Sequence, residues 1–147
     1  MKTSQRGIDL IKSFEGFSEE AYLCPAGIWT IGYGHTDRVQ PGGRVTEEEA
    51  EILLRHDLEW HEARVRKLVT KPMRQGQFDA FVSLSFNTRA DTFAKSSAVR
   101  LFNEGLDYDA GNAFLLICKA RVDGELITLN GLVRRRKAER ELFRAAD

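Results

Sequence analysis

The sequence is poor in the residues that build metal sites and disulfide scaffolds. Its 147 residues include two cysteines, Cys24 and Cys118, and three histidines. No Cys-x-x-Cys pair is present, and no histidine stands at metal-ligand spacing from a cysteine. We therefore expect no metal site and no cofactor. For a chain made in a reducing compartment, two free thiols are expected rather than a disulfide.

The sequence also lacks long apolar runs and an excess of charge of either sign. Charged residues interrupt the first dozen positions, so no signal-peptide core is predicted, and no segment is apolar for long enough to span a bilayer. These features predict a soluble chain made in the cytoplasm. The formal net charge is +0, which gives no general case for nucleic-acid binding. The single basic cluster, Arg134 to Lys137, is expected to be mostly a solvent-exposed helix face.

The hydrophobic content and the periodicity of the sequence predict one folded domain of the α+β class. Hydrophobic residues make up 42% of the chain, enough for a substantial core. Helical spacing of apolar residues predicts helices over about 4–14, 46–69, 74–87, 97–104, 107–118 and 130–145, and alternation predicts a small antiparallel sheet within 17–36. A turn or a small hairpin is expected at 122–125. Thr46 and Glu49 are expected to form a capping box, and the helix over 74–87, which is apolar on several sides, is expected to be the central core helix. We expect an N-terminal lobe over 1–60, including the sheet and a linking helix, and a helical lobe over 61–147.

The most informative segment is the one that joins the first helix to the sheet. Glu15 ends the helical pattern, eight residues separate it from Cys24, and five more separate Cys24 from Thr30. A carboxyl group then leaves a helix end while a thiol and a hydroxyl lie on the hairpin that follows. This order can place three polar groups around one cleft.

These residues resemble the phage-type lysozymes, endolysins similar to the T4 enzyme that form glycoside hydrolase family 24. That family carries Glu, eight residues, Asp or Cys, five residues and Thr, followed by Ile-Gly-x-Gly-His, and the chain matches it at Glu15, Cys24 and Thr30 to His35. Two further blocks match in family order: Gln77 to Ala80 with Phe86 and Asn87, and Gly131 to Arg136 with Glu139, Leu142 and Phe143.

The resemblance implies a lysozyme-like fold and a muramidase that hydrolyses the β-1,4 bond between N-acetylmuramic acid and N-acetylglucosamine in bacterial peptidoglycan. It implies Glu15 as general acid, since cleaving a glycosidic bond requires a group that protonates the leaving oxygen. It also implies an arginine beside the acid, either Arg134 or Arg135. Cys24 and Thr30 are implied to position water and stabilise the transition state, and His35, Phe86 and Asn87 to line the sugar cleft.

Taken alone, each of these residues also has an ordinary structural explanation. His35 could simply bond the turn, Phe86 could belong to the core, and Asn87 could cap a helix. Cys24 could be a small buried hydrophobe. Since a free thiol is mostly protonated near neutrality, and an ionised Glu15 nearby would raise its pKa further, we expect Cys24 to shape the water or cation site and not to act as a full nucleophile.

Three other functions compete with hydrolysis of the wall. An inactive sugar-binding module of the same fold would not need the acid. A lytic transglycosylase would form an anhydro sugar in place of adding water. A helical nucleic-acid binder would use Arg134 to Lys137 as its contact surface. For the leading hypothesis we expect a monomer whose partner is peptidoglycan, with no nucleic acid and no membrane bound. If a phage encodes it, a membrane-permeabilising partner of the holin type would release it to the cell wall.

Overall fold

The computed structural model describes residues 1–146 and has the α+β fold that the sequence predicts. The helices are α1 (Gln5–Glu15), α2 (Glu47–Leu68), α3 (Gln75–Asn87), α4 (Ala90–Ala94), α5 (Ser97–Asn103), α6 (Asp107–Ala113), the 3-10 turn η1 (Phe114–Leu116) and α7 (Asn130–Arg144). Two antiparallel hairpins complete it: β1 (Ser18–Leu23) with β2 (Trp29–Gly32), and β3 (Lys119–Val122) with β4 (Glu125–Thr128).

Local sequence signals explain where the two N-terminal helices begin. The Ser4 hydroxyl accepts a hydrogen bond from Gly7 N–H at the start of α1. At the start of α2, Thr46 and Glu49 form the predicted capping box, in which each side chain accepts from the other residue's backbone N–H. The negative charges of the glutamates in that first turn interact favourably with the positive end of the helix dipole.

Two elements differ from the prediction. The short helix α4 was not expected, because its five residues are too few to show helical periodicity. The 107–118 region is also shorter than predicted: α6 ends at Ala113 and passes through η1 into the strand β3. The turn at 122–125 closes the hairpin β3–β4, in which Val122 pairs with Glu125. Asp123 (φ 51°) and Gly124 (φ 82°) both take the left-handed conformation that a tight two-residue hairpin requires.

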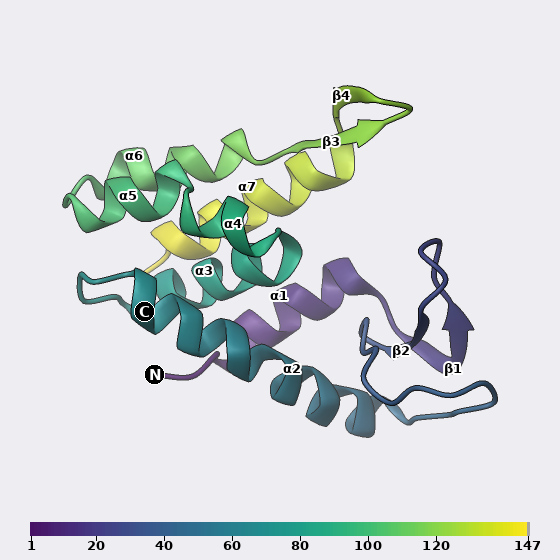
Figure 1. Ribbon diagram of the computed structural model, residues 1–147. Coiled ribbons are helices and arrows are strands. Elements are labelled where there is room, and N and C mark those ends of the chain that lie inside the picture. Colours follow the sequence, from purple (N-terminus) through teal and green to yellow (C-terminus); the bar gives the residue numbers. More distant parts are fainter. Residues whose placement is uncertain (147) are drawn as a thin grey trace.

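Helix α3 runs through the centre of the molecule, between α7 on one side and α1 and α2 on the other (Figure 1). Every residue from Gly76 to Ser85 is buried, which confirms α3 as the central core helix. Phe81 packs against a cluster of aromatic rings at centroid distances of 5.5–6.3 Å, formed by Phe93, Phe102, Phe114 and Phe143. The backbones of α3 and α7 meet closely at Gly76, where an added Cβ would lie 2.6 Å from the Leu142 carbonyl oxygen.

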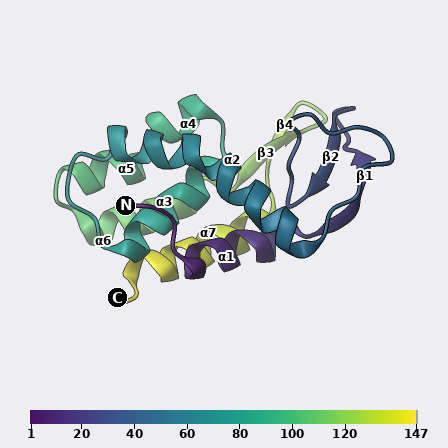
Figure 2. The ribbon, with the colours of Figure 1, turned by 90° about the horizontal axis from the view of Figure 1, so that it is seen from below.

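The two hairpins lie at the same end of the molecule, and the N-terminus and the last turn of α7 lie toward the other end (Figures 1 and 2). Helix α2 spans 22 residues between the β1–β2 hairpin and the helices around α5. The buried core is one cluster that takes Ile8 and Ile11 from α1 as well as residues from α2, α3 and the later helices. Within residues 1–146, none of the helices is both long and apolar enough to cross a bilayer.

His61 lies where α2 packs on α3, and its burial has a consequence for stability. Its Nδ1 is 2.8 Å from the Ser85 hydroxyl, and its ring meets those of Trp60 and Phe86 edge to face. Burial lowers the pKa of the His61 imidazole, Arg64 lowers it further, and Asp57 opposes them.

Because the folded-state pKa of His61 is depressed, an unfolded chain binds a proton below about pH 6.5 that the folded chain does not bind. We expect the urea midpoint of unfolding to fall as the pH is lowered from 7.5 to 5.5, and to fall less for His61→Gln. The exposed His56 of the same helix supplies the control, since His56→Gln should keep the wild-type dependence. An identical pH dependence for His61→Gln and wild type would contradict this assignment.

Candidate active site

Glu15 is the last residue of α1, where Gly16 (φ 74°) turns the chain out of the helix. Its side chain is 22% exposed, so its carboxyl group remains accessible to a ligand. A Cβ built on Gly34 would lie 3.3 Å from Glu15 Oε1, and the backbone of the loop after β2 therefore closes over the acid. Arg135 Nη1 donates to Glu15 Oε2 across 2.5 Å.

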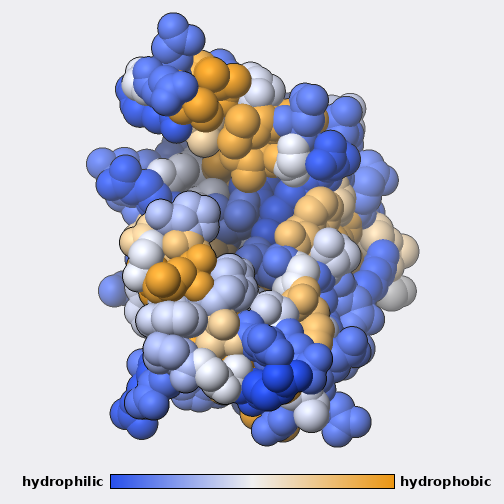
Figure 3. All heavy atoms as spheres, turned by 90° about the vertical axis from the view of Figure 1, so that its right-hand side faces the viewer, coloured by the Kyte–Doolittle hydropathy of each residue, from blue (hydrophilic) through white to orange (hydrophobic). Residues whose placement is uncertain are grey.

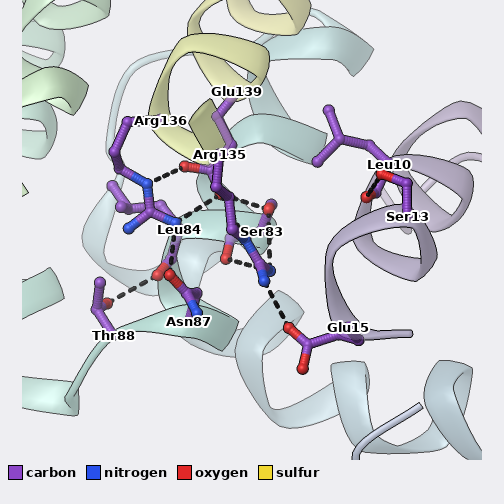
Figure 4. Close-up of polar contacts among 10 residues, drawn as sticks. All are labelled: Leu10, Ser13, Glu15, Ser83, Leu84, Asn87, Thr88, Arg135, Arg136 and Glu139. Carbon is purple, nitrogen blue, oxygen red and sulfur yellow. Dashed lines mark hydrogen bonds and ion pairs between the residues drawn. The ribbon is translucent and has the colours of Figure 1, made fainter. Parts of the chain in front are cut away.

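Arg135 is part of a buried polar network between α3 and α7 (Figure 4). Its Nε lies 3.4 Å from Glu139 Oε2, and Glu139 also accepts a hydrogen bond from the Ser83 hydroxyl. Arg136 Nε lies 2.6 Å from Glu139 Oε1, and Arg136 Nη2 donates to Glu139 Oε2 across 3.0 Å. Arg136 Nη2 also donates to Asn87 Oδ1 across 2.8 Å. The network thus joins Glu15 to Asn87 through two arginines and one glutamate.

The structure brings Arg135, and not Arg134, to the acid. Arg134 and Lys137 are exposed, but Arg135 and Arg136 are 3% and 0% exposed. The expectation that the basic cluster is mostly a solvent-exposed face is therefore wrong for half of its members. Their charges are compensated by glutamates from the same helix and from α1, so they are not available to bind nucleic acid.

Cys24 and Thr30 lie together at the end of the β1–β2 hairpin. Cys24 follows β1, and Thr30 on β2 pairs with Tyr22 of β1. The Thr30 hydroxyl donates to the Ile28 carbonyl oxygen across 3.0 Å, and Gly27 N–H donates to the Cys24 carbonyl oxygen across 2.8 Å. Residues 24–28 therefore form a tight turn whose first residue carries the thiol.

That turn lowers the pKa of the Cys24 thiol. Hydrogen bonding by the Ile28 backbone is the main cause, with smaller contributions from the backbones of Ala26 and Gly27 and from the Thr30 hydroxyl, while burial acts in the opposite direction. The expectation that Glu15 would raise this pKa is wrong, because the turn surrounds the sulfur with groups that stabilise the thiolate. Both Cys24 and Cys118 are free thiols.

His35 is buried beside Asp57 of α2. It is 8% exposed, and its Nδ1 lies 2.8 Å from a carboxylate oxygen of Asp57 on α2. Its backbone exchanges two hydrogen bonds with Ile31, each of 2.9 Å. These contacts tie the loop after β2 to α2 and fit the structural explanation for His35. Phe86 is half-buried, and the edge-to-face contact of its ring with His61 likewise fits a packing role.

A pocket of about 570 Å³ lies beside the acid, within the usual size range for ligand sites. Arg135 and Asn87 line it, together with the ends of α1 and α7 at Ser13, Phe14, Leu129, Gly131, Leu132 and Arg134. Viewed from the side that carries both hairpins, the surface is hollowed, with a hydrophilic floor between apolar patches (Figure 3). The exposed apolar residues of the hairpins are Tyr22, Leu23, Ile28, Val122, Leu126 and Ile127.

Sequence reasoning missed three residues that build this site. Phe14 lines the pocket, and the Arg135 guanidinium lies over its ring at 5.7 Å from the centroid. Ser83 and Glu139 hold the two arginines from inside the protein. Glu139 stands in the third matching block, so that block was the available signal, but nothing in the sequence tells which arginine it contacts. Within residues 1–146, no group of three or more His, Cys, Asp or Glu side chains could hold a metal ion.

Comparisons with known proteins place the chain in a family. A family model described as phage lysozyme matches residues 12–139. An endolysin of Acyrthosiphon pisum secondary endosymbiont phage 1 is 41% identical, with 99% of this chain and 100% of the relative aligned. The muramidase domain of SpmX from Asticaccaulis excentricus superposes with a TM-score of 0.94 at 43% identity, over 99% of each chain. A mutant of P22 lysozyme superposes with a TM-score of 0.88 at 39% identity, also over 99% of each chain.

Proposed function

The chain belongs to the phage lysozyme family, and from that premise we propose that it is an endolysin-type muramidase. Its substrate would be bacterial peptidoglycan, and the bond cleaved the β-1,4 link between N-acetylmuramic acid and N-acetylglucosamine. The observation that carries the proposal is Glu15 itself, a partly exposed carboxyl group at a helix end, held by Arg135 beside an open pocket. The Glu-Cys-Thr spacing further supports glycoside hydrolase family 24.

In this proposal Glu15 is the general acid. Protonation of the leaving oxygen must accompany the growth of positive charge on the sugar ring. Glu15 is partly exposed and lies against Arg135, which lines the pocket, so its proton can reach a sugar bound there. Arg135 fixes the carboxyl group in one orientation, which removes freedom that would otherwise be lost in the transition state.

Cys24 and Thr30 are proposed to position the attacking water and to stabilise the developing cation. Their support is the shared hairpin end, where the Thr30 hydroxyl and the thiol are neighbours. Asn87 is proposed to contact the sugar, since it lines the pocket and its side-chain oxygen is fixed by Arg136. His35, paired with Asp57, is proposed to support the loop under this site, and Phe86 to border it.

We also propose that the chain acts as a monomer and needs no cofactor. A phage-encoded enzyme of this kind would require a holin-type partner to reach the wall. This proposal rests on the family alone.

Digestion of purified peptidoglycan followed by mass spectrometry of the products tests the function. Hydrolysis predicts fragments that carry one added water and end in a reducing sugar. Fragments that end in an anhydro sugar would instead identify a lytic transglycosylase. Binding to peptidoglycan with no soluble fragment, and no clearing of outer-membrane-permeabilised cells, would identify a binding module.

A further inference from the structure

The buried carboxylate of Glu139 answers a difficulty in the proposed mechanism, and the inference drawn from it rests on that mechanism. A general acid must hold a proton, yet the Arg135 guanidinium places a positive charge 2.5 Å from the Glu15 carboxyl group, and a nearby positive charge favours a carboxylate over a carboxylic acid. A guanidinium is always charged, so this effect cannot be switched off by deprotonation. Something must reduce the field that Arg135 exerts on the acid.

Glu139 lies where its negative charge can reduce the field of Arg135 at Glu15. It is 0% exposed and lies against Arg135 on the side away from Glu15, with contacts of 3.4 Å to Arg135 and 2.6 Å to Arg136 (Figure 4). The groups that contact its carboxyl oxygens are all hydrogen-bond donors: two guanidiniums and the Ser83 hydroxyl. Because two guanidiniums, which carry a permanent positive charge, contact its carboxyl oxygens, we take Glu139 as ionised. Burial raises the pKa of Glu139 above its ordinary value, and the two arginines and Ser83 counteract only part of that rise.

We propose that Glu139 is a positioning residue whose buried negative charge offsets Arg135 and thereby lets Glu15 keep its proton at the pH of catalysis. Glu139 cannot touch substrate, because no part of it reaches the surface. Its effect on the reaction passes through Arg135 to Glu15, and through Arg136 to the Asn87 oxygen.

The charges around this network are few, which makes its electrostatics predictable. The network itself contains Arg135, Arg136 and Glu139 of α7 and the acid Glu15 of α1, and Arg134 of α7 lines the adjacent pocket. The helix α3 supplies Ser83 and Asn87, which are neutral, and its only charged residue, Asp79, is bonded to Ser4 and Gln75 at the start of α1 and α3. With two positive and two negative groups, removal of one changes the balance by a full charge.

The test measures proton binding to Glu15 by carbon-13 NMR of its side-chain carboxyl, identified as the signal lost in Glu15→Gln. In Glu139→Gln, Arg135 is no longer offset, and the titration midpoint of Glu15 should fall by about half to one pH unit. In Arg136→Gln, a positive charge is removed instead, and the midpoint should rise by a similar amount. The alkaline limb of the wall-lysis profile should move in the same direction in each variant.

Glu62→Gln is the matched control, because Glu62 is also a buried glutamate but bonds Thr3, which precedes α1. It should leave the Glu15 midpoint unchanged even where it lowers the melting temperature. Opposite shifts in the two network variants support the proposal. Shifts of the same sign, or none above about a fifth of a pH unit, would overturn it. If Glu139→Gln does not fold, Arg136→Gln decides alone: a rise supports the proposal, and no rise overturns it.

The NMR titration needs no substrate, so it separates this proposal from the proposed function. Opposite midpoint shifts in a chain that fails to cleave peptidoglycan would reject the muramidase and keep the electrostatic role of Glu139. Cleavage of peptidoglycan with an unmoved midpoint would keep the muramidase and reject that role.

Discussion

Replacement of Glu15 by glutamine should abolish wall lysis and leave the fold intact. Glutamine has the shape of glutamate and can still accept a hydrogen bond from Arg135 through its side-chain oxygen. It has no proton to give to the leaving oxygen, and a positioned general acid contributes about 10²–10⁴ in rate. We therefore expect a loss of at least about 100-fold in the clearing of permeabilised cells.

Glu19→Gln controls for the loss of a surface charge in the same region. Glu19 lies on β1, is exposed and pairs with the exposed Arg44, so its variant should lyse walls at the wild-type rate. Circular dichroism and melting temperatures would show that both variants are folded. A folded Glu15→Gln protein with more than about a tenth of wild-type activity would remove Glu15 from the role of acid.

The sequence predicted those parts of the fold that depend on short-range rules. The capping box at Thr46 and Glu49 acts over four residues, and α3 shows its burial through apolar residues on several sides. Both therefore leave a clear pattern in the sequence. The short helix α4 has no such pattern, and its Arg89 N-cap makes no side-chain hydrogen bond to the helix. Its existence depends on Phe93, which the aromatic core buries.

The site was harder to predict because its contacts join residues far apart in the chain. Arg134, Arg135 and Arg136 are alike in sequence, and only the rotation of α7 against α3 decides which of them meets Glu15. That rotation is set by packing such as the approach of Gly76 to Leu142. Burial of the two arginines also depends on Glu139 and Ser83, which compensate a charge that would otherwise be too costly to bury.

For Cys24 the sequence correctly predicted a position on the same hairpin as Thr30, but it predicted the wrong direction for the pKa shift of the thiol. The sign of its pKa shift comes from the backbone of residues 26–28, which the turn directs at the sulfur. The charged residues of the sequence include Glu15, but the sequence does not show where these peptide groups lie relative to the sulfur. Turn geometry thus decides a property that residue identity alone left open.

The second large effect on activity is expected from substitution of Cys24, the first residue of the same turn. Cys24→Ala should lose activity by about tenfold or more, because alanine leaves no group to orient water or to stabilise the sugar cation. Cys24→Asp should retain activity. Aspartate also accepts hydrogen bonds from the backbone two to four residues on, so the turn that now stabilises the thiolate can hold a carboxylate in its place. Asp is, in addition, the residue that the family pattern allows at this position.

Cys118→Ala is the control, since Cys118 lies between η1 and β3 and not on the β1–β2 hairpin. It should behave as wild type in lysis assays with and without reductant. Initial rates on purified peptidoglycan, measured for all three variants at one pH and again across pH 5–9, would give the comparison. Because the carboxylate of Cys24→Asp is ionised throughout that range while a thiol titrates within or near it, the aspartate variant should also show the flatter profile. If Cys24→Ala matches wild type at every pH, the thiol only fills space at the end of the hairpin, and Thr30 alone would be left to position the water.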